Sequence, residues 1–305
     1  MLRKWTFLAS VVMLVIVALP VEANEPVHVL VANDDGVEAP GLAPLVAVLA
    51  ADPSYRVTVV APLHQQSVTG HGLITRRDVE VNAHPPIAGA PSWSVDATPA
   101  TVARLALTAL LLDDPPALVV SGINRGENDG LGAWTSGTIA VAREGAYAGI
   151  PAVAVSQQLN WQDPQPDFAA AARWAKPVID AVRDEGLPRG VYLNVNVPIE
   201  TASIRGYRVA KMGLARSDSA RYELAREGAD GTRWYTSRWA PPRKTEAGGD
   251  SHALNLGWVT IVPLGLDQTA EQAMPLLQQL ELQLPPPVTA NEVQPRAGAG
   301  GEPPG

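Results

Sequence analysis

Residues 27–62 read VHVLVANDDGVEAPGLAPLVAVLAADPSYRVTVVAP, and this stretch decides the fold. Val27–Ala32 and Tyr55–Pro62 are short apolar runs rich in β-branched residues, which is the pattern of buried strands. Gly41–Ala50 is an Ala/Leu-rich stretch that follows Pro40, and it predicts a helix. A strand, a helix and a strand in succession form a βαβ unit, which predicts a parallel sheet with right-handed crossovers.

The same alternation continues along the chain. Helices are predicted over Thr98–Leu112, Thr138–Ala148 and Phe168–Glu185. Strands are predicted over Ala117–Ser121, Ala152–Ser156 and Val191–Val197. We therefore expect an α/β fold built on a Rossmann-like, doubly wound, mostly parallel sheet.

The pattern changes after Ile204. Arg205–Met212 and Trp258–Pro263 are predicted strands, and the polar, Trp/Arg-rich segment Ala215–Gly249 between them predicts β-hairpin extensions and loops. Thr269–Leu284 is a candidate amphipathic C-terminal helix. Pro285–Gly305 is rich in Pro, Gly and Ala, which predicts a disordered tail.

The N-terminus has the layout of a secretory signal peptide. Arg3 and Lys4 precede the apolar run Trp5–Leu19, and Val21-Glu22-Ala23 offers small or aliphatic residues at the two positions that a signal peptidase reads. An uncleaved anchor is the alternative, but the run is short for a span of about 20 residues. We expect cleavage near Ala23, which would give a secreted, periplasmic protein without stable membrane association. The predicted domain then covers residues 24–284, between the signal peptide 1–23 and the tail 285–305.

Composition excludes several classes of protein. Hydrophobic residues make up 46% of the chain and charged residues 18%, so a packed core is expected and global disorder is not. The net charge is −8 and no Lys/Arg cluster occurs, which argues against a nucleic-acid polymer as partner. The absence of cysteine excludes disulfides, Cys-ligated zinc, iron–sulfur clusters and a thiol nucleophile.

Three polar clusters follow predicted strands. They are the segments 33–36 (NDDG), 65–71 (QQSVTGH) and 121–128 (SGINRGEN). Ligands of open parallel sheets bind outside the carboxyl ends of the strands. We therefore expect the carboxylates, hydroxyls and amides of the three clusters to meet at one edge of the sheet.

Asp34 and Asp35 are adjacent carboxylates in the first of these clusters. Two ionised carboxylates repel each other in a partly buried crevice unless a cation or several donors stabilise them. A set of carboxylate, amide and hydroxyl oxygens suits Mg²⁺ or Mn²⁺. The alternative is that Asn-Asp-Asp-Gly only forms a turn, for which the same residues are also well suited.

Residues Ser136-Gly137-Thr138 stand directly before a predicted helix. The exposed backbone N–H groups of such a helix end can bind a phosphate group. Simple capping by Ser136 or Thr138 is the alternative, and it needs no ligand. Trp134 lies beside this segment and is a candidate to stack on a base. No Gly-Lys-Ser/Thr sequence occurs, which excludes a P-loop NTPase.

Several motifs resemble, in the same order, those of the SurE family of nucleotidases and acid phosphatases. The motifs are VLVANDDGVEAPGLAPL from residue 29, VVAPLHQQSVTGHGLIT (59–75), SGINRGEN (121–128), SGTIAVAREGAYAGIPAVAVS (136–156), LNVNVP (193–198) and LGWVTIVPL (256–264). The resemblance covers about residues 27–270. It implies a metal-dependent phosphatase that acts on nucleoside 5′- and 3′-monophosphates, on a Rossmann-like core with a swapped C-terminal segment that supports homodimers or homotetramers.

The resemblance also implies the residues of the site. The metal ligands fall on Asp34, Asp35, Ser67 and Asn124, and they imply one divalent ion, Mg²⁺ or Mn²⁺, per subunit. The phosphate-contacting Ser-Gly-Thr falls on Ser136, Gly137 and Thr138, and we add Asn128 to this group.

Metal-assisted hydrolysis follows from this set, with Asp34 and Asp35 as the catalytic residues. Asp35 is placed to orient or deprotonate the attacking water, while an aspartyl-phosphate route through either aspartate stays open. Two other functions also stay open: a broad-specificity acid phosphatase, and a secreted binding protein that has lost turnover. We expect structural roles for His64, His71 and His252, because no phosphohistidine motif of the Arg-His-Gly type accompanies them.

Overall fold

The structure is a computed structural model that describes residues 25–160, 166–214, 221–238, 245 and 247–280. The chain divides into two compact units, residues 1–266 and residues 267–305, which are described separately. The predicted signal peptide 1–23 and tail 285–305 lie outside the described residues. No described helix is long and apolar enough to cross a membrane.

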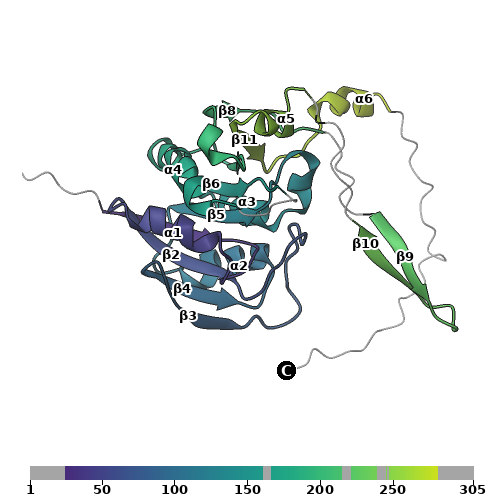
Figure 1. Ribbon diagram of the computed structural model, residues 1–305, viewed down its shortest axis with the longest axis horizontal. Helices are drawn as coiled ribbons and strands as arrows, with labels where there is room; N and C mark the ends of the chain where they lie inside the picture. The colour runs from purple at the N-terminus through teal and green to yellow at the C-terminus, as the bar shows by residue number, and fades with distance from the viewer. Residues whose placement is uncertain (1–24, 161–165, 215–220, 239–244, 246, 281–305) are drawn as a thin grey trace, which may run out of the picture. The chain divides into compact units, whose positions relative to one another are not determined.

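A nine-stranded sheet forms the centre of the first unit, in the order β3-β4-β2-β1-β5-β6-β7-β11-β8. In Figure 1 this order runs from β3 at the bottom to β8 at the top. The strands are β1 Val27–Ala32, β2 Tyr55–Pro62, β3 Val81–Ile87, β4 Ala90–Val95, β5 Leu118–Arg125, β6 Ala152–Gln157, β7 Val191–Val197, β8 Tyr207–Val209 and β11 Val259–Gly265.

The central strands of this sheet all run in one direction. β4, β2, β1, β5, β6 and β7 are joined by parallel pairs, while β3 is antiparallel to β4 and β11 is antiparallel to β7. The carboxyl ends of β1, β2 and β5 therefore lie at the same edge, where open α/β sheets bind ligands. The predicted fold class, a mostly parallel α/β sheet, is confirmed.

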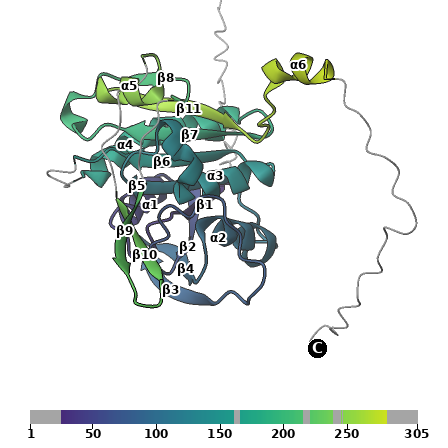
Figure 2. The same cartoon turned by 90° about the vertical axis from the view of Figure 1, so that its right-hand side faces the viewer.

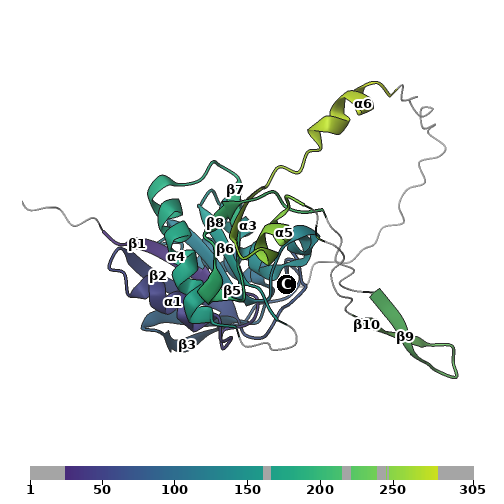
Figure 3. The ribbon, with the colours of Figure 1, turned by 45° about the horizontal axis from the view of Figure 1, so that its top comes forward.

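Helices cover both faces of the sheet. α1 Leu42–Ala50 and α4 Phe168–Glu185 contact each other on one face, as Figure 3 shows. α2 Pro99–Leu105 and α3 Gly137–Tyr147 contact each other on the opposite face, and Figure 2 shows both. Each face has its own cluster of buried apolar side chains, because successive residues of the strands point to opposite faces. This burial is the main stabilising term of the fold.

Several predicted elements differ from the observed ones. β3 and β4 are not predicted, because β3 contains Pro85 and Pro86, which only an edge strand accommodates, and β4 has no β-branched run. The helix predicted over Thr98–Leu112 is α2 followed by a π-helical turn, Ala106–Leu110. The strand predicted over Ala117–Ser121 continues to Arg125 as β5. A short 3-10 turn, Thr201–Ser203, and α5, Asp250–Asn255, are also not predicted.

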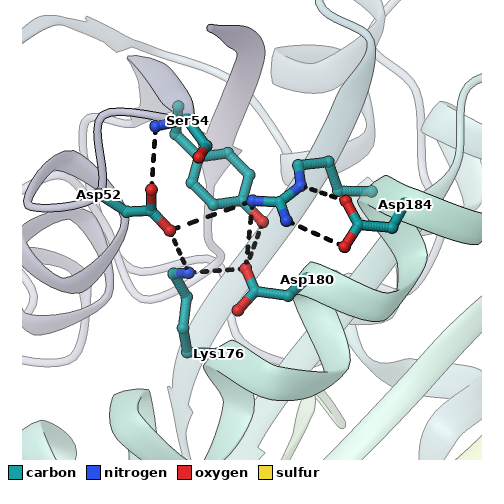
Figure 4. Close-up of polar contacts among 7 residues, drawn as sticks. Asp52, Ser54, Lys176, Asp180 and Asp184 are labelled. Carbon is teal, nitrogen blue, oxygen red and sulfur yellow. Dashed lines mark hydrogen bonds and ion pairs between the residues drawn. The ribbon is translucent and has the colours of Figure 1, made fainter. Parts of the chain in front are cut away.

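An ion-pair network joins α4 to the turn between α1 and β2 (Figure 4). Lys176 Nζ lies 2.7 Å from Asp52 Oδ2 and 2.6 Å from Asp180 Oδ1. The hydroxyl of Tyr55 donates to Asp180 Oδ1 at 2.6 Å, and Arg183 lies over the Tyr55 ring. Tyr55 begins β2, so this network lies at the amino ends of the strands, away from the edge where the polar clusters meet.

Two smaller pieces lie outside the large sheet. β9 Arg221–Glu227 and β10 Arg233–Arg238 form an antiparallel hairpin, so the predicted hairpin extension is present. In the second unit, a 3-10 turn Glu271–Ala273 leads into α6 Met274–Gln278, which is much shorter than the predicted helix Thr269–Leu284. The apolar residues of α6 are exposed. In the described part of this unit, therefore, no burial of apolar surface stabilises a longer helix.

Candidate active site

The turn after β1 presents two aspartates at the carboxyl edge of the sheet. The side chain of Asn33 closes the turn, because its Nδ2 donates to Gly36 O at 2.7 Å and its Oδ1 accepts from Gly36 N at 3.3 Å. Gly36 adopts φ +104°, a conformation that glycine favours. The turn is therefore formed by Asn33 and Gly36, and the carboxylates of Asp34 and Asp35 remain available for other contacts.

Asp34 is buried against the first turn of α3. Its side chain is only 4% exposed, and Thr138 Oγ1 donates a hydrogen bond to Asp34 Oδ1 at 2.5 Å. Burial and the neighbouring charge of Asp35 raise the pKa of Asp34 to about 7, although the hydroxyl of Thr138 favours the ionised form. An ionised Asp34 therefore has a large electrostatic cost that a bound cation would remove.

Gly137 allows this close approach. A Cβ atom on Gly137 would lie 2.7 Å from Asp34 Cβ and 2.8 Å from Pro99 Cγ, closer than real Cβ contacts come. Only glycine therefore lets the start of α3 pack directly on Asp34. The consequence is that the backbone N–H groups at the start of α3 are brought next to a carboxylate.

Asp35 is held by the end of β5. Its Oδ2 accepts from the backbone N–H of Arg125 at 3.0 Å, and its Oδ1 accepts from Gln65 Nε2 at 3.4 Å. Burial raises the pKa of Asp35, and both hydrogen bonds oppose that shift. The three polar clusters expected to meet at one edge do meet here, since Asp35, Gln65 and Arg125 each come from a different one.

Asn124 is buried in β5, beside the residue that contacts Asp35. The pairing of β5 with β6 shifts register between Ser121 and Asn124. Such a shift indicates a β-bulge, which changes the direction in which a side chain points. Asn124 Nδ2 donates to Gly126 O at 2.7 Å. Because the amide nitrogen is used in this way, Oδ1 is the polar atom that Asn124 has to offer a ligand.

Ser67 lies on an exposed loop after β2 and makes no hydrogen bond to either aspartate within the described chain. The loop itself is tied to the site, because Gln66 N donates to Asp34 O at 2.7 Å. Val68, the next residue, adopts φ +65°, which is unfavourable for a β-branched side chain. Strain of this kind is characteristic of functional loops.

Two asparagines of β7 hold the backbone of Asn128 in place. Asn196 Oδ1 accepts from Asn128 N at 2.8 Å, and Asn194 Nδ2 donates to Asn128 O at 2.7 Å. The side-chain amide of Asn128 donates to Ser156 Oγ at 2.8 Å and lies 3.4 Å from Thr138 Oγ1. Asn128 thus lies next to the residue that contacts Asp34.

Ser136 caps α3, because its Oγ accepts from Ile139 N at 3.1 Å. The capping interpretation of Ser136 is therefore observed. The N–H groups of Gly137 and Thr138 have no acceptor within α3 and lie, buried, at the positive end of the helix dipole. The site thus combines two carboxylates with a helix end that attracts anions.

A buried network ties the loop of Ser67 to α3, and it was not predicted from the sequence. Glu144 is 2% exposed and accepts two hydrogen bonds from Arg104, at 2.7 and 2.9 Å. His71 Nε2 lies 2.5 Å from Glu144 Oε1, and Arg143 lies 3.3 Å from His71 Nδ1. Arg143 can only donate, so Nδ1 accepts and the Nε2–H of His71 donates to Glu144.

Burial opposes ionisation of Glu144, but the hydrogen bonds from His71 and Arg104 outweigh it, so the pKa of Glu144 lies below its usual range. The charged Glu144 holds His71, and with it the loop, in place. The expected structural role of His71 agrees with this geometry. The signal in the sequence was Glu144 within the mostly apolar segment 137–146, because glutamate is almost never buried unless it is paired.

The donors present fit a hard divalent cation. No group of three or more His, Cys, Asp or Glu side chains suited to a metal occurs among the described residues, so ligands beyond Asp34 and Asp35 would be neutral. No Lys or Arg side chain forms an ion pair with either aspartate in that part of the chain. Two carboxylates with raised pKa and a neighbouring amide oxygen are an oxygen-only set, which Mg²⁺ and Mn²⁺ prefer.

Comparison with known proteins identifies the family of this chain. The family model described as "Survival protein SurE" matches residues 29–219. The chain belongs to the SurE family. A relative named 5′-nucleotidase SurE from Symbiobacterium thermophilum is 39% identical, over 83% of this chain and 98% of the relative. Another SurE 5′-nucleotidase, from Desulfatibacillum aliphaticivorans, is 42% identical over 63% of this chain and 74% of the relative.

A solved structure of the SurE family has the same fold. The crystal structure of the SurE protein from Aquifex aeolicus superposes with a TM-score of 0.70 at 31% identity, covering 82% of this chain and 98% of that one. Both the predicted family and the predicted fold class are thus confirmed.

The expectation of a secreted, periplasmic protein is corrected. The SurE relatives are named only as 5′-nucleotidases, and nothing in them supports secretion. The apolar run that suggested a signal peptide lies within residues 1–24, outside the described part of the chain. An apolar N-terminal pattern without a structural or family counterpart is insufficient to assign a location.

Proposed function

We propose that this chain is a divalent-metal-dependent phosphomonoesterase that hydrolyses nucleoside 5′- and 3′-monophosphates. The observation that carries the proposal is the packing of Asp34, the neighbour of Asp35, against the amino end of α3, which puts a candidate cation site beside a candidate anion site. The curated relatives confirm the coarser prediction of a hydrolase acting as a 5′-nucleotidase.

The metal would be held by Asp34, Asp35, Ser67 and Asn124, with water in the remaining positions. When bound, a divalent ion supplies Lewis acidity, which withdraws charge from a phosphoryl group. It also removes the cost of keeping both aspartates ionised, which their raised pKa values express. The chemistry of the donor set favours one Mg²⁺ or Mn²⁺ ion per subunit.

The protein residues would activate the water and bind the phosphate group. Asp35 is less buried than Asp34 and is held by the backbone of Arg125, so it is suited to orient or deprotonate an attacking water. The backbone N–H groups of Gly137 and Thr138, with Asn128 beside Thr138, are suited to line the position of the equatorial phosphate oxygens. The hydroxyl of Ser136 caps α3 by accepting from Ile139 N, and its O–H is suited to donate to a phosphate oxygen. A route through an aspartyl-phosphate remains an alternative.

A panel of phosphomonoesters tests the proposal. Purified protein with Mn²⁺ is assayed on 5′-AMP, 3′-AMP, ribose 5-phosphate and β-glycerophosphate, each with and without excess EDTA. We expect release of phosphate from both nucleotides that stops with EDTA. Equal rates on all four substrates would instead support a broad-specificity acid phosphatase. Absence of turnover on every substrate, together with binding of 5′-AMP, would support a binding protein.

We also propose a homodimer or homotetramer. The hairpin β9–β10 exposes large apolar side chains, with Tyr222 72% and Tyr235 55% exposed. A two-stranded hairpin is marginally stable by itself, so a second copy of the chain is the natural source of additional packing. Light scattering that finds only a 32.2 kDa species at micromolar concentration would contradict this.

A further inference from the structure

Trp134 is placed on the rim of the candidate active site. It belongs to the 3-10 helix Gly130–Thr135, two residues before Ser136, so its Cα lies within about 7 Å of the residue that caps α3. Its side chain is 48% exposed. The neighbouring Ala133 is 3% exposed and provides the packing of this short helix.

Trp134 also lies against the loop that carries Ser67. The backbone of Gly70 donates to Thr135 O at 3.0 Å, and a Cβ on Gly70 would lie 3.4 Å from Trp134 O. The residue is therefore located where the loop of the metal site meets the segment that leads into α3. The junction is therefore within reach of the far end of a nucleotide whose phosphate group is bound at the start of α3.

The half-exposed indole of Trp134 makes no aromatic or cation–π contact within the described chain and belongs to neither core cluster, unlike the other described tryptophans. Trp174 packs on Tyr207 with ring centroids 5.5 Å apart, and Trp234 and Trp258 have arginines over their rings. Trp93 packs against a hydrophobic cluster of the core. Tryptophan is normally placed where its large apolar surface is used, so a free indole at a ligand site calls for a flat apolar ligand group.

We propose that Trp134 is the base-stacking residue of this enzyme and that it selects nucleoside monophosphates over phosphomonoesters without a base. This inference rests on the proposed function and identifies its specificity determinant. Every base has a π-face, so a single stacking side chain favours nucleotides without strongly distinguishing among bases. Purines present the larger ring surface, and we expect them to be preferred over pyrimidines.

The test compares 5′-AMP with ribose 5-phosphate, which carries the same phosphate and sugar but no base. Steady-state kinetics with saturating Mn²⁺ are measured for wild type, Trp134→Ala and Trp134→Phe. Loss of a stacked base corresponds to a change of about 5- to 150-fold. We expect Trp134→Ala to raise KM for 5′-AMP in this range with little change in kcat, because stacking acts on substrate and transition state alike.

On ribose 5-phosphate the Trp134→Ala variant should match wild type, and Trp134→Phe should retain most of the affinity for 5′-AMP. Leu112→Ala removes another large exposed apolar side chain, 64% exposed and outside the site, and should change the kinetics on neither substrate. Equal KM changes on both substrates, or none on 5′-AMP, would overturn the role of Trp134 while leaving the phosphatase proposal intact. Hydrolysis of neither substrate by wild type would overturn the proposed function itself.

Discussion

Gly137 and Asp34 are packed so closely that a single added methyl group would not fit between them. A Cβ on Gly137 would lie 2.7 Å from Asp34 Cβ and 3.0 Å from Asp34 Oδ2. The contact joins the end of β1 to the start of α3, which are far apart in sequence. It therefore fixes the distance between the carboxylate and the helix end on which the proposed chemistry depends.

Gly137→Ala should lower kcat/KM by roughly 10²-fold, because a displacement of about 1 Å at a reacting centre has effects of this size. The fold should persist, since alanine favours the helix. Gly132→Ala, in the preceding turn, is the matched control, because a Cβ there meets nothing within 4 Å. Phosphatase kinetics and circular dichroism on both variants check this, and equal activity of the two would contradict the role given to the contact.

Asp35→Asn should lower turnover by roughly 10²-fold or more, the range expected for a positioned acid–base group. The substitution keeps the size of the side chain and removes its repulsion with Asp34, so stability should not fall. Asp113→Asn, at an exposed carboxylate away from the site, serves as control. If Asp35→Asn retained wild-type turnover and metal dependence, the carboxylate would belong only to the turn.

Thr138→Val should have a smaller effect than Asp35→Asn. It removes the hydroxyl that donates to Asp34, but it leaves the backbone N–H groups at the start of α3 unchanged. We expect a rise in KM of a few-fold to about 10-fold, as for the loss of one hydrogen bond of about 1 kcal/mol. Thr138→Ser keeps the hydroxyl and should recover most of the affinity. Kinetics in which both variants are equally impaired would assign the effect to packing.

Metal binding can be measured without turnover. Isothermal titration of the metal-free protein with Mn²⁺ should show one site per chain, and Asp34→Asn should weaken it by 10-fold or more, because one of two carboxylate ligands is lost. Asp113→Asn should bind as wild type does. Unchanged Mn²⁺ affinity in Asp34→Asn would remove this residue from the ligand set, whatever the activity of the variant.

Asp52→Asn tests the ion-pair network of Figure 4 through its pH dependence. The hydrogen bond from Lys176 lowers the pKa of Asp52 to about 2. Because the pKa of Asp52 is lower in the folded than in the unfolded state, its charge stabilises the fold at pH values above the unfolded pKa of about 3.9. That contribution is lost as the pH falls towards 2. We expect a loss of about 1 kcal/mol or less at pH 7, because Asp52 is partly exposed, and a smaller difference at pH 3.

Urea unfolding of wild type and Asp52→Asn at pH 7, 4 and 3 provides the measurement. Asp184→Asn, which removes the carboxylate paired with Arg183 on the same helix, is a useful comparison because Lys176 and Asp52 stay paired. A stability difference for Asp52→Asn that stays constant between pH 7 and pH 3 would show that its charge makes no contribution.

The sequence by itself determined most of the alternation of strands and helices and the position of the candidate site residues in it. β1, β2, β7 and α4 have the predicted bounds, because the three strands are short runs rich in β-branched residues and α4 is a long segment with apolar residues at helical spacing. Asp34 and Asp35 could be recognised because polar residues directly after a parallel strand lie at its ligand-binding edge. These are local properties, encoded within a few consecutive residues.

Only the tertiary structure decided how the site is held together. The contacts of Thr138 with Asp34, of Asn196 with Asn128 and of Glu144 with His71 join residues 104, 68 and 73 positions apart. No local pattern specifies which helix end packs on which strand end, because that pairing follows from burying both faces of the whole sheet at once. The same burial raises the pKa of Asp34 to about 7, an effect that exists only when the chain has removed its carboxylate from water.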